Sequence, residues 1–316
     1  MKNILTPIKW TGSKRTQAKR IIDCMPKHIS CYCELFLGSG AVLMELLTNY
    51  QDRLVDDNGN KSRIIVSDTN PDLIAMWKKI KSDPSTVISF YESEWKNRNT
   101  LNGELKPDDN SQEMVDHRNK HYYALRDKYN KNLLSGNEEQ GMLLMCLLAF
   151  NFNGLVRYGK QGFNAACMPV VPGIHPDTKK EIITNCSKLL NEYNVDINCS
   201  SYDNLYIPTM STIYLDPPYK MFLNDKNKGG GVYNSGNFNL DDFTNWCNNI
   251  EYCNLLVSFD GGDIGEKYFP SDKYKKITND TGISNFRRQM TKTKEPKKSL
   301  KTSESLYVKE FKVNKL

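Results

Sequence analysis

The segment TIYLDPPYKM (residues 211–220) places a carboxylate, two prolines and a tyrosine after a strand-like run. The carboxylate of Asp216 and the backbone carbonyl of Pro217 would form two fixed acceptors, because proline stiffens the chain and removes a donor. Tyr219 would add a flat ring. Such a group matches the exocyclic amine of a nucleobase extruded from its stack. The alternative is that Pro217 and Pro218 only end a strand and that the tyrosine only packs.

An exocyclic amine of this kind is a poor nucleophile, because its lone pair is conjugated with the ring. Hydrogen bonds from both of its N–H groups would favour a pyramidal nitrogen, whose lone pair becomes available as a new bond forms. The matching electrophile is a methyl group on a sulfonium, transferred in line. Positioning and electrostatics could supply the rate without a metal or a covalent intermediate.

A second group of residues, Glu34 to Gly40 (ELFLGSG), indicates a cofactor site. Gly38 and Gly40 follow a strand-like run, so the backbone could approach a bound molecule closely and the next helix could offer its amide groups. The motif lacks the third glycine of a dinucleotide fingerprint, which disfavours NAD. Asp68 ends another strand-like run and could accept hydrogen bonds from both hydroxyls of a ribose. Together these residues indicate a cofactor that contains adenosine.

Hydrophobic patterning predicts the elements that position these groups. Residues 31–37 (CYCELFL) and 64–68 (IIVSD) are typical of buried strands, with an apolar helical stretch at 41–50 between them. A further helix is expected to begin with Asn70 as its N-cap and Pro71 at its first position. Strand, glycine-rich turn, helix and strand, in this order, predict a βαβ unit of a doubly wound fold.

The N-terminal and C-terminal parts of the chain are expected to complete one sheet. Strand character returns at three places: 211–215, 254–260 and 305–311. Residues 83–195 differ from these flanks, because aromatic-rich helical patterns surround a central segment rich in Asn, Gly, Phe and Arg. We therefore predict a catalytic domain of residues 1–82 and 196–316 with an inserted domain of residues 83–195.

The composition is typical of a globular intracellular protein. The 316 residues are 39% hydrophobic and 25% charged, and the nine scattered cysteines read as reduced core residues. The N-terminus lacks an apolar signal segment, and the longest apolar run, 142–150, is too short to cross a bilayer. His117 and His121 could share a helix face, but without a third ligand nearby we expect no metal. We expect a cytoplasmic location, or the interior of the host cell if the gene is viral.

The formal charge of +6 is concentrated near the C-terminus. Between Arg287 and Lys301 there are seven basic residues and one acid, Glu295. This stretch is either a solvated loop or a segment that contacts phosphates.

The segment NFNGLVRYGKQGFN (151–164) carries side chains that could read DNA. Arg157 could fork onto guanine O6 and N7, and Leu155 could meet a thymine methyl group. Phe152 could fill the gap left by an extruded base. The alternative is that the glycines and asparagines only build a hairpin turn with Arg157 on its surface.

Five segments, in one order, make the chain resemble a known family. The motifs of the Dam-type DNA adenine-N6 methyltransferases (D12 class, alpha group) are similar to KWTGSK (9–14), ELFLGSG (34–40), SDTNPDLI (67–74), NFNGLVRYGKQGFN (151–164) and DPPY (216–219). The resemblance runs from residue 7 to about residue 243. It implies methyl transfer from S-adenosylmethionine, with S-adenosylhomocysteine as product, to N6 of an adenine flipped out of duplex DNA.

The resemblance also implies roles for individual residues. Cofactor contacts are implied for Trp10, Lys14, Glu34, Phe36, Gly38, Ser39, Gly40, Asp68, Tyr202 and Asp216. Catalytic roles are implied for Asp216, Pro217, Pro218 and Tyr219, and DNA contacts for Lys9, Phe152, Asn153, Leu155 and Arg157. Two positions depart from the family pattern, because Ser201 replaces an aspartate beside Tyr202 and Leu35 replaces a proline.

The implied fold class is α/β, with a Rossmann-like S-adenosylmethionine-dependent methyltransferase sheet and an inserted, mostly helical DNA-recognition domain that carries a β-hairpin. The expected partner is double-stranded DNA with GATC or another GAT-containing site, with no membrane association and a monomeric enzyme. A cytosine-N4 or RNA-base methyltransferase would use the same amine chemistry, although Asp rather than Ser before Pro-Pro-Tyr favours adenine. A DNA-binding relative without turnover is the other alternative, and Lys14, Asp68, Asp216 and Tyr219 argue against it.

Overall fold

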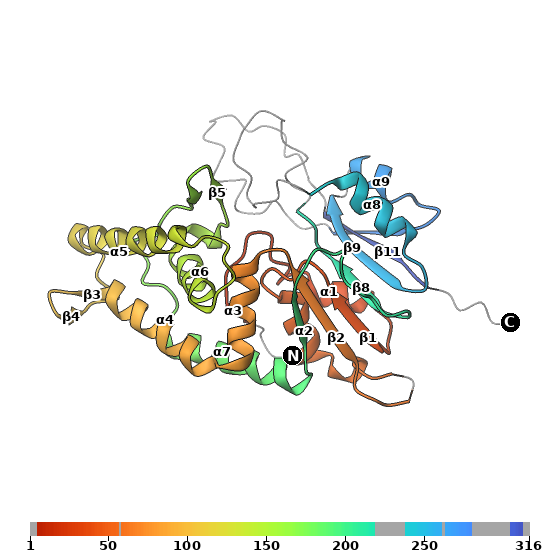
Figure 1. Ribbon diagram of the computed structural model, residues 1–316, viewed down its shortest axis with the longest axis horizontal. Helices are drawn as coiled ribbons and strands as arrows, with labels where there is room; N and C mark the ends of the chain where they lie inside the picture. Colours follow the sequence, from red (N-terminus) through yellow and green to blue (C-terminus); the bar gives the residue numbers. More distant parts are fainter. Residues whose placement is uncertain (1–4, 57, 219–237, 261–262, 280–303, 312–316) are drawn as a thin grey trace.

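The computed structural model describes residues 5–56, 58–218, 238–260, 263–279 and 304–311 (Figure 1). The predictions for Tyr219 and for the basic stretch between Arg287 and Lys301 lie outside the described residues.

A seven-stranded sheet joins the two ends of the described chain. Its strands are β1 (Cys31–Glu34), β2 (Arg63–Asp68), β7 (Asp196–Cys199), β8 (Thr212–Leu215), β9 (Asn254–Asp260), β10 (Lys275–Asn279) and β11 (Glu304–Lys309). Their spatial order is β10-β11-β9-β8-β1-β2-β7. The run from β9 to β7 is parallel, whereas β11 is antiparallel to both β9 and β10. The predicted α/β fold with a Rossmann-like sheet is confirmed.

The central strands are buried because helices cover both faces of the sheet. All four residues of β1 and of β8 are buried, as expected for parallel strands between two layers. Tyr32 of β1 faces a core shared with the helices between strands, and its neighbours Cys31 and Cys33 face a second core shared with the helix at 240–249. β7 and β10 are two strands that hydrophobic patterning did not predict, and both lie at the edges of the sheet.

The helices of the described residues divide into those on the sheet and those beside it (Figure 1). They are α1 (Ala18–Asp23), α2 (Ala41–Asn49), α3 (Pro71–Ser82), α4 (Pro84–Asn99), α5 (Gln112–Lys131), α6 (Glu138–Phe150), α7 (Pro176–Glu192), α8 (Leu240–Asn249) and α9 (Asp263–Tyr268). Figure 1 shows α4, α5 and α6 gathered to one side of the sheet, with α8 and α9 near β9 and β11. The predicted start of α3 is confirmed, since the Asn70 side chain accepts hydrogen bonds from the backbone N–H groups of Asp72 and Leu73.

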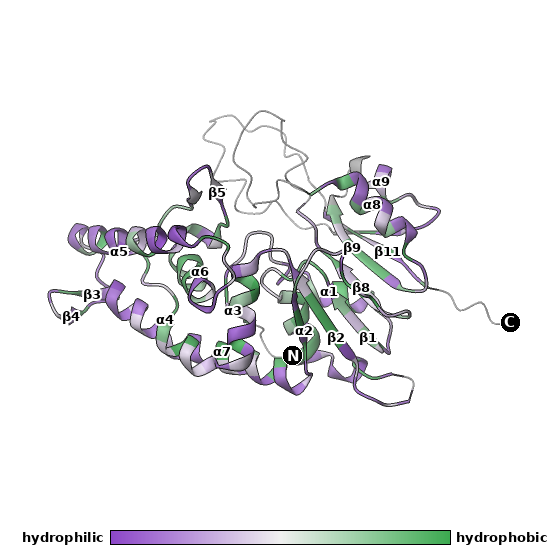
Figure 2. Cartoon of the chain, viewed as in Figure 1, coloured by the Kyte–Doolittle hydropathy of each residue, from purple (hydrophilic) through white to green (hydrophobic). Residues whose placement is uncertain are grey.

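Helix α6 joins the helices beside the sheet to those on it. Figure 2 shows it as predominantly hydrophobic, and every residue from Gln140 to Phe150 is buried. It packs against α3, and a Cβ atom added to Gly141 would lie 2.5 Å from the backbone nitrogen of Met76. The glycine therefore permits the close approach of the two helices. The β-hairpin predicted in this region is present as β5 (Tyr158–Gly159) and β6 (Gly162–Phe163).

Candidate active site

Three acids lie at one edge of the sheet, at the carboxyl ends of neighbouring strands. Glu34 ends β1 and Asp68 ends β2, while Asp216 follows β8 on the other side of β1. The register places Glu34 level with Val66 and Tyr214, so Asp68 and Asp216 both lie two residues further along. Ligands of open α/β sheets bind at this edge.

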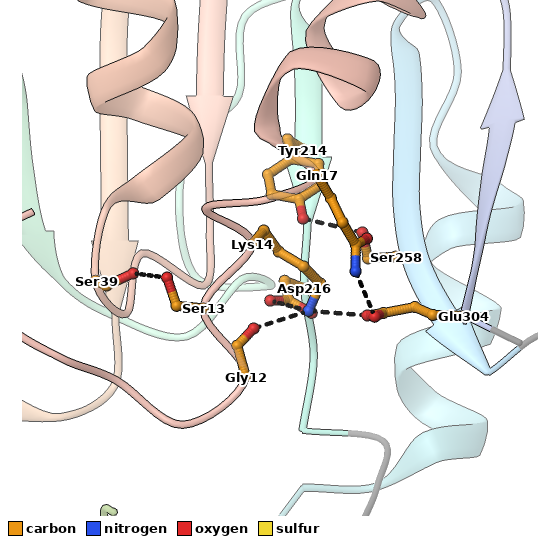
Figure 3. A network of polar contacts seen from close by, with 9 residues as sticks. All are labelled: Gly12, Ser13, Lys14, Gln17, Ser39, Tyr214, Asp216, Ser258 and Glu304. Carbon is orange, nitrogen blue, oxygen red and sulfur yellow. Dashed lines mark hydrogen bonds and ion pairs between the residues drawn. The ribbon is translucent and has the colours of Figure 1, made fainter. Parts of the chain in front are cut away.

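A buried lysine holds Asp216 (Figure 3). Lys14 Nζ lies 2.7 Å from both carboxylate oxygens of Asp216 and 3.0 Å from Glu304 Oε1, and its side chain is only 5% exposed. Gln17 Nε2 donates to the other oxygen of Glu304 at 2.8 Å. Burial alone would lower the pKa of Lys14, but the negative charges of Asp216 and Glu304 outweigh it and raise the pKa. Lys14 is therefore an ammonium that fixes the orientation of the aspartate.

The structure gives Lys14 a neighbour that the sequence analysis did not assign to it. Its ammonium lies directly on the carboxylate of Asp216, while the contact with the cofactor that the resemblance implies stays a prediction. Glu304, the second acid on this lysine, was missed by the sequence analysis. It begins β11 in the run ESLYVK, and no local pattern separates an acid that faces a buried lysine from a solvated one at a strand end.

Glu34 is a buried carboxyl group, 3% exposed. Its Oε2 accepts a hydrogen bond from the Tyr32 hydroxyl at 2.8 Å. Burial raises the pKa of Glu34 to about 8, and the charge of Asp216 adds to this effect. Glu34 is consequently protonated at neutral pH and can donate a hydrogen bond.

The pKa of Glu34 predicts a pH-dependent stability. Because it is raised from 4.5 in an ordinary glutamic acid to about 8, the folded state binds the proton more tightly. The contribution of this proton to the free energy of unfolding is fully present below pH 4.5, and it is lost as the pH rises through about 8. Urea unfolding at about pH 6 and about pH 9 is expected to show a larger loss of stability in the wild type than in Glu34→Gln, which stays neutral. Equal losses in the two proteins would contradict this assignment.

The glycine turn is tied to Asp68. Gly38 N donates to Asp68 Oδ2 at 3.0 Å, and Asn70 N donates to Asp68 Oδ1 at 3.0 Å. Burial raises the pKa of Asp68, although these backbone hydrogen bonds act in the opposite direction. Gly40 has a φ of +64°, and a Cβ atom there would lie 2.7 Å from the ring of Trp77. The turn can therefore form only with glycine at this position.

The N-terminal segment lies along the glycine turn. A Cβ atom added to Gly38 would lie 3.0 Å from Trp10 Nε1, and the hydroxyls of Ser13 and Ser39 are 2.8 Å apart. The structure thus brings Trp10 and Ser39, two of the expected cofactor contacts, to the same turn.

An aromatic pair lies beyond the turn. The rings of Phe36 and Tyr202 stack with centroids 5.8 Å apart, and Tyr202 is 8% exposed. Phe243 and Trp246 of α8 contact the edges of the Tyr202 ring. Phe36 and Tyr202, two of the expected cofactor contacts, therefore lie side by side and form one apolar surface.

The residues predicted to contact DNA form a second group. Phe152 to Gly154 form a turn in which Asn153 has a φ of 56° and lies exposed. Lys9 lies against Gly154, which has no space for a Cβ atom, and Thr11 Oγ1 donates to the Gly154 carbonyl at 3.2 Å. The N-terminal segment therefore connects this turn to the glycine turn.

The next residues form the start of the hairpin. Arg157 is exposed, Leu155 is partly buried, and the Leu155 carbonyl accepts a hydrogen bond from Asn151 Nδ2 at 2.8 Å. In the Asp-Pro-Pro-Tyr segment, Pro217 is buried and Pro218 is partly buried.

Comparison with known proteins identifies the family. The family model of the D12 class N6 adenine-specific DNA methyltransferases matches residues 10–254. The chain belongs to this class. The resemblance drawn from its five motifs is confirmed, and the enzyme is an adenine-specific DNA methyltransferase rather than a cytosine-N4 enzyme.

Curated relatives agree with this assignment. The chain is 31% identical to the type II methyltransferase M.MjaIII of Methanocaldococcus jannaschii over 247 residues, which cover 74% of this chain and 75% of that protein. It is 23% identical to the DNA adenine methylase of Haemophilus influenzae over 297 residues, or 91% of each chain. It is 24% identical to the DNA adenine methylase of Vibrio cholerae over 241 residues, which cover 74% and 72% of the two chains.

The part of the chain that the structure describes contains neither a candidate metal site nor a candidate membrane span. No group of three or more His, Cys, Asp or Glu side chains in those ranges could hold a metal ion. Among the helices there, none is both long enough and apolar enough to span a bilayer.

Proposed function

We propose that the enzyme transfers a methyl group from S-adenosylmethionine to N6 of an adenine that is flipped out of duplex DNA. One observation supports this most strongly: Asp216 lies at the carboxyl edge of the sheet, held by Lys14, on the strand next to the one that ends in the glycine turn. An amine acceptor and a cofactor cradle on adjacent strands are what direct transfer between two bound molecules requires.

The glycine turn and the side chains around it, which together form the cofactor cradle, fit S-adenosylmethionine. Asp68 would accept hydrogen bonds from the ribose hydroxyls, and the rings of Phe36 and Tyr202 would pack against the adenine. The methionine part would be bound by the turn and its neighbours: Trp10, Glu34, Gly38, Ser39 and Gly40. When bound, the cofactor supplies an electrophilic methyl group on a sulfonium.

Asp216 and Pro217 would bind the amino group of the target. A carboxylate offers about four acceptor positions, so Asp216 can accept from an amine while Lys14 holds it. The carbonyl of Pro217 would be the second acceptor, and Pro218 and Tyr219 would complete the catalytic group. Because Lys14 fixes Asp216 in place, little reorganisation is needed when charge develops on the amine.

Residues 83–195 would form the target-recognition domain, and residues 1–82 and 196–316 the catalytic domain. Lys9, Phe152, Asn153, Leu155 and Arg157 would contact DNA from the turn and hairpin described above. We propose GATC or another GAT-containing site as the target, and a monomeric enzyme in the cytoplasm, or inside the host cell if the gene is viral.

Arg157→Ala is expected to relax site selection. The exposed guanidinium can make a bidentate contact with guanine, whose loss costs about 1–3 kcal/mol of discrimination, or about 5- to 150-fold. The measurement is kcat/KM on a duplex with the site and on duplexes with single-base changes. Lys160→Ala is the matched control, because it removes a positive charge from the same hairpin but no group that can make a bidentate contact. It is expected to weaken binding to all duplexes alike. Unchanged discrimination in Arg157→Ala would disprove this role.

Methylation-sensitive sequencing of DNA from cells that express the chain tests the proposed function. The expected result is N6-methyladenine within one short sequence, accompanied by transfer of tritium from labelled cofactor to purified duplex DNA. Unmodified DNA in cells that contain the folded protein would overturn the proposal, and modification of another site would overturn the GAT assignment alone.

A further inference from the structure

A chain of hydrogen bonds runs from the cofactor side of the sheet to the hairpin. Asn70 N donates to Asp68 Oδ1 at 3.0 Å, and Asn70 Nδ2 donates to the Tyr158 hydroxyl at 3.2 Å. The hydroxyls of Tyr158 and Tyr129 are 3.3 Å apart, and Tyr129 donates to Asp72 Oδ2 at 2.8 Å. The proton positions are mutually consistent, because Tyr158 can accept from Asn70 and donate to Tyr129.

This chain of hydrogen bonds is buried at the end formed by Tyr129 and Asp72. Tyr129 and Asp72 have no exposed surface, and Tyr158 is 7% exposed. Asp72 also accepts hydrogen bonds from the backbone N–H groups of Leu134 at 2.9 Å and Gly136 at 2.8 Å. Water cannot replace a lost member of such a chain, so each link is costly to break.

Tyr158 links this chain of hydrogen bonds to the hairpin. It is the first residue of β5 and directly follows Arg157 in the sequence. Tyr158 is buried and its hydroxyl is bound by Asn70 and Tyr129, whereas Arg157 is exposed. The position of the arginine relative to Asp68 is therefore set through the tyrosine beside it.

We propose that Tyr158 is a positioning residue that couples occupancy of the cofactor site to sequence-specific DNA binding. This inference rests on the proposed function. A ligand bound to Asp68 restrains Asn70 and, through it, Tyr158, so the hairpin loses less conformational freedom when it then binds DNA. By linkage, a specific duplex must strengthen cofactor binding by the same factor.

The test is Tyr158→Phe, which keeps the ring and removes the hydroxyl. Anisotropy titrations with a site-containing duplex are run with and without S-adenosylhomocysteine. The wild type is expected to bind more tightly with it by about 5- to 150-fold, the usual range of coupling, and Tyr158→Phe by less than about 3-fold. Calorimetry without DNA is expected to give equal affinities of the two proteins for S-adenosylhomocysteine. An undiminished enhancement in Tyr158→Phe would overturn the inference.

Two further variants separate coupling from simple loss of stability. Tyr122→Phe removes another buried hydroxyl, which donates to the Ala165 carbonyl at 2.9 Å. This hydroxyl does not belong to the chain of hydrogen bonds from Asp68 to Asp72. Tyr122→Phe is expected to retain the full enhancement. Asn70→Ser keeps a capping oxygen but removes the amide, and it is expected to behave like Tyr158→Phe. An equal reduction in Tyr122→Phe would mean a merely structural effect and would overturn the inference.

Failure of this inference is distinguishable from failure of the proposed function. A wild type that methylates DNA at its site but shows no enhancement by S-adenosylhomocysteine overturns the coupling alone. A folded wild type that neither binds the site nor methylates it overturns the proposed function.

Discussion

Asp216→Asn is expected to lower kcat for methyl transfer by at least about 10²–10³-fold, while affinity for the duplex changes by less than about threefold. The substitution preserves size but removes the negative charge, and it can place an amide N–H group where the target amine needs an acceptor. The amine would then lose the interaction that develops as its lone pair is freed. Single-turnover rates with saturating cofactor and DNA measure this loss directly.

Asp203→Asn is the matched control for this variant. Asp203 is an exposed acid next to Tyr202, so the exchange is chemically identical but lies outside the Lys14 network. Turnover of this control is expected to stay within about twofold of the wild type. A rate for Asp216→Asn above a tenth of the wild-type rate would show that the carboxylate does not have the proposed role.

Lys14→Met is expected to lower kcat by about 100-fold. Without the ammonium, the carboxylates of Asp216 and Glu304 lose the cation between them and repel each other, so Asp216 no longer keeps the orientation in which it would accept from the target amine. Single-turnover rates with saturating cofactor and DNA measure this loss.

The double variant Lys14→Met/Glu304→Gln distinguishes this charge effect from a packing defect. Breaking a buried ion pair by removing one partner costs about 3–5 kcal/mol, because the other charge is left uncompensated. Neutralising Glu304 removes that repulsion, so the double variant is expected to be more stable and more active near neutral pH than Lys14→Met. Equal activity of the two variants would contradict the proposed role of the lysine.

Local chemistry made much of the fold and the cradle predictable. Asn70 and Pro71 are a helix start that depends only on neighbouring residues, and it was found where expected. Asp68 and Asp216 were placed at one edge because each follows an apolar run that forms a parallel strand, whereas Glu34 was expected inside the run 31–37 and is the last residue of β1. In these cases the interactions that determine the local structure join residues close in sequence. Hydrophobic periodicity and helix-capping residues are therefore enough to predict it.

The contacts between distant segments were not predictable in this way. Glu304 meets Lys14 only because β11 pairs with β9, and Tyr158 meets Asn70 only because the hairpin folds back onto α3. Such contacts depend on the packing of whole elements, which no local pattern encodes. The resemblance supplied Lys14 as a functional residue, but its position on the aspartate came from the three-dimensional arrangement.

The most direct test of the central claim is a crystal structure of the enzyme with a site-containing duplex and S-adenosylhomocysteine. The measured quantities are the distances from the target N6 to the Asp216 carboxylate and to the Pro217 carbonyl. We expect an extruded adenine with both distances at or below about 3.2 Å. A stacked adenine, or an extruded adenine whose N6 lies away from both acceptors, would contradict the account.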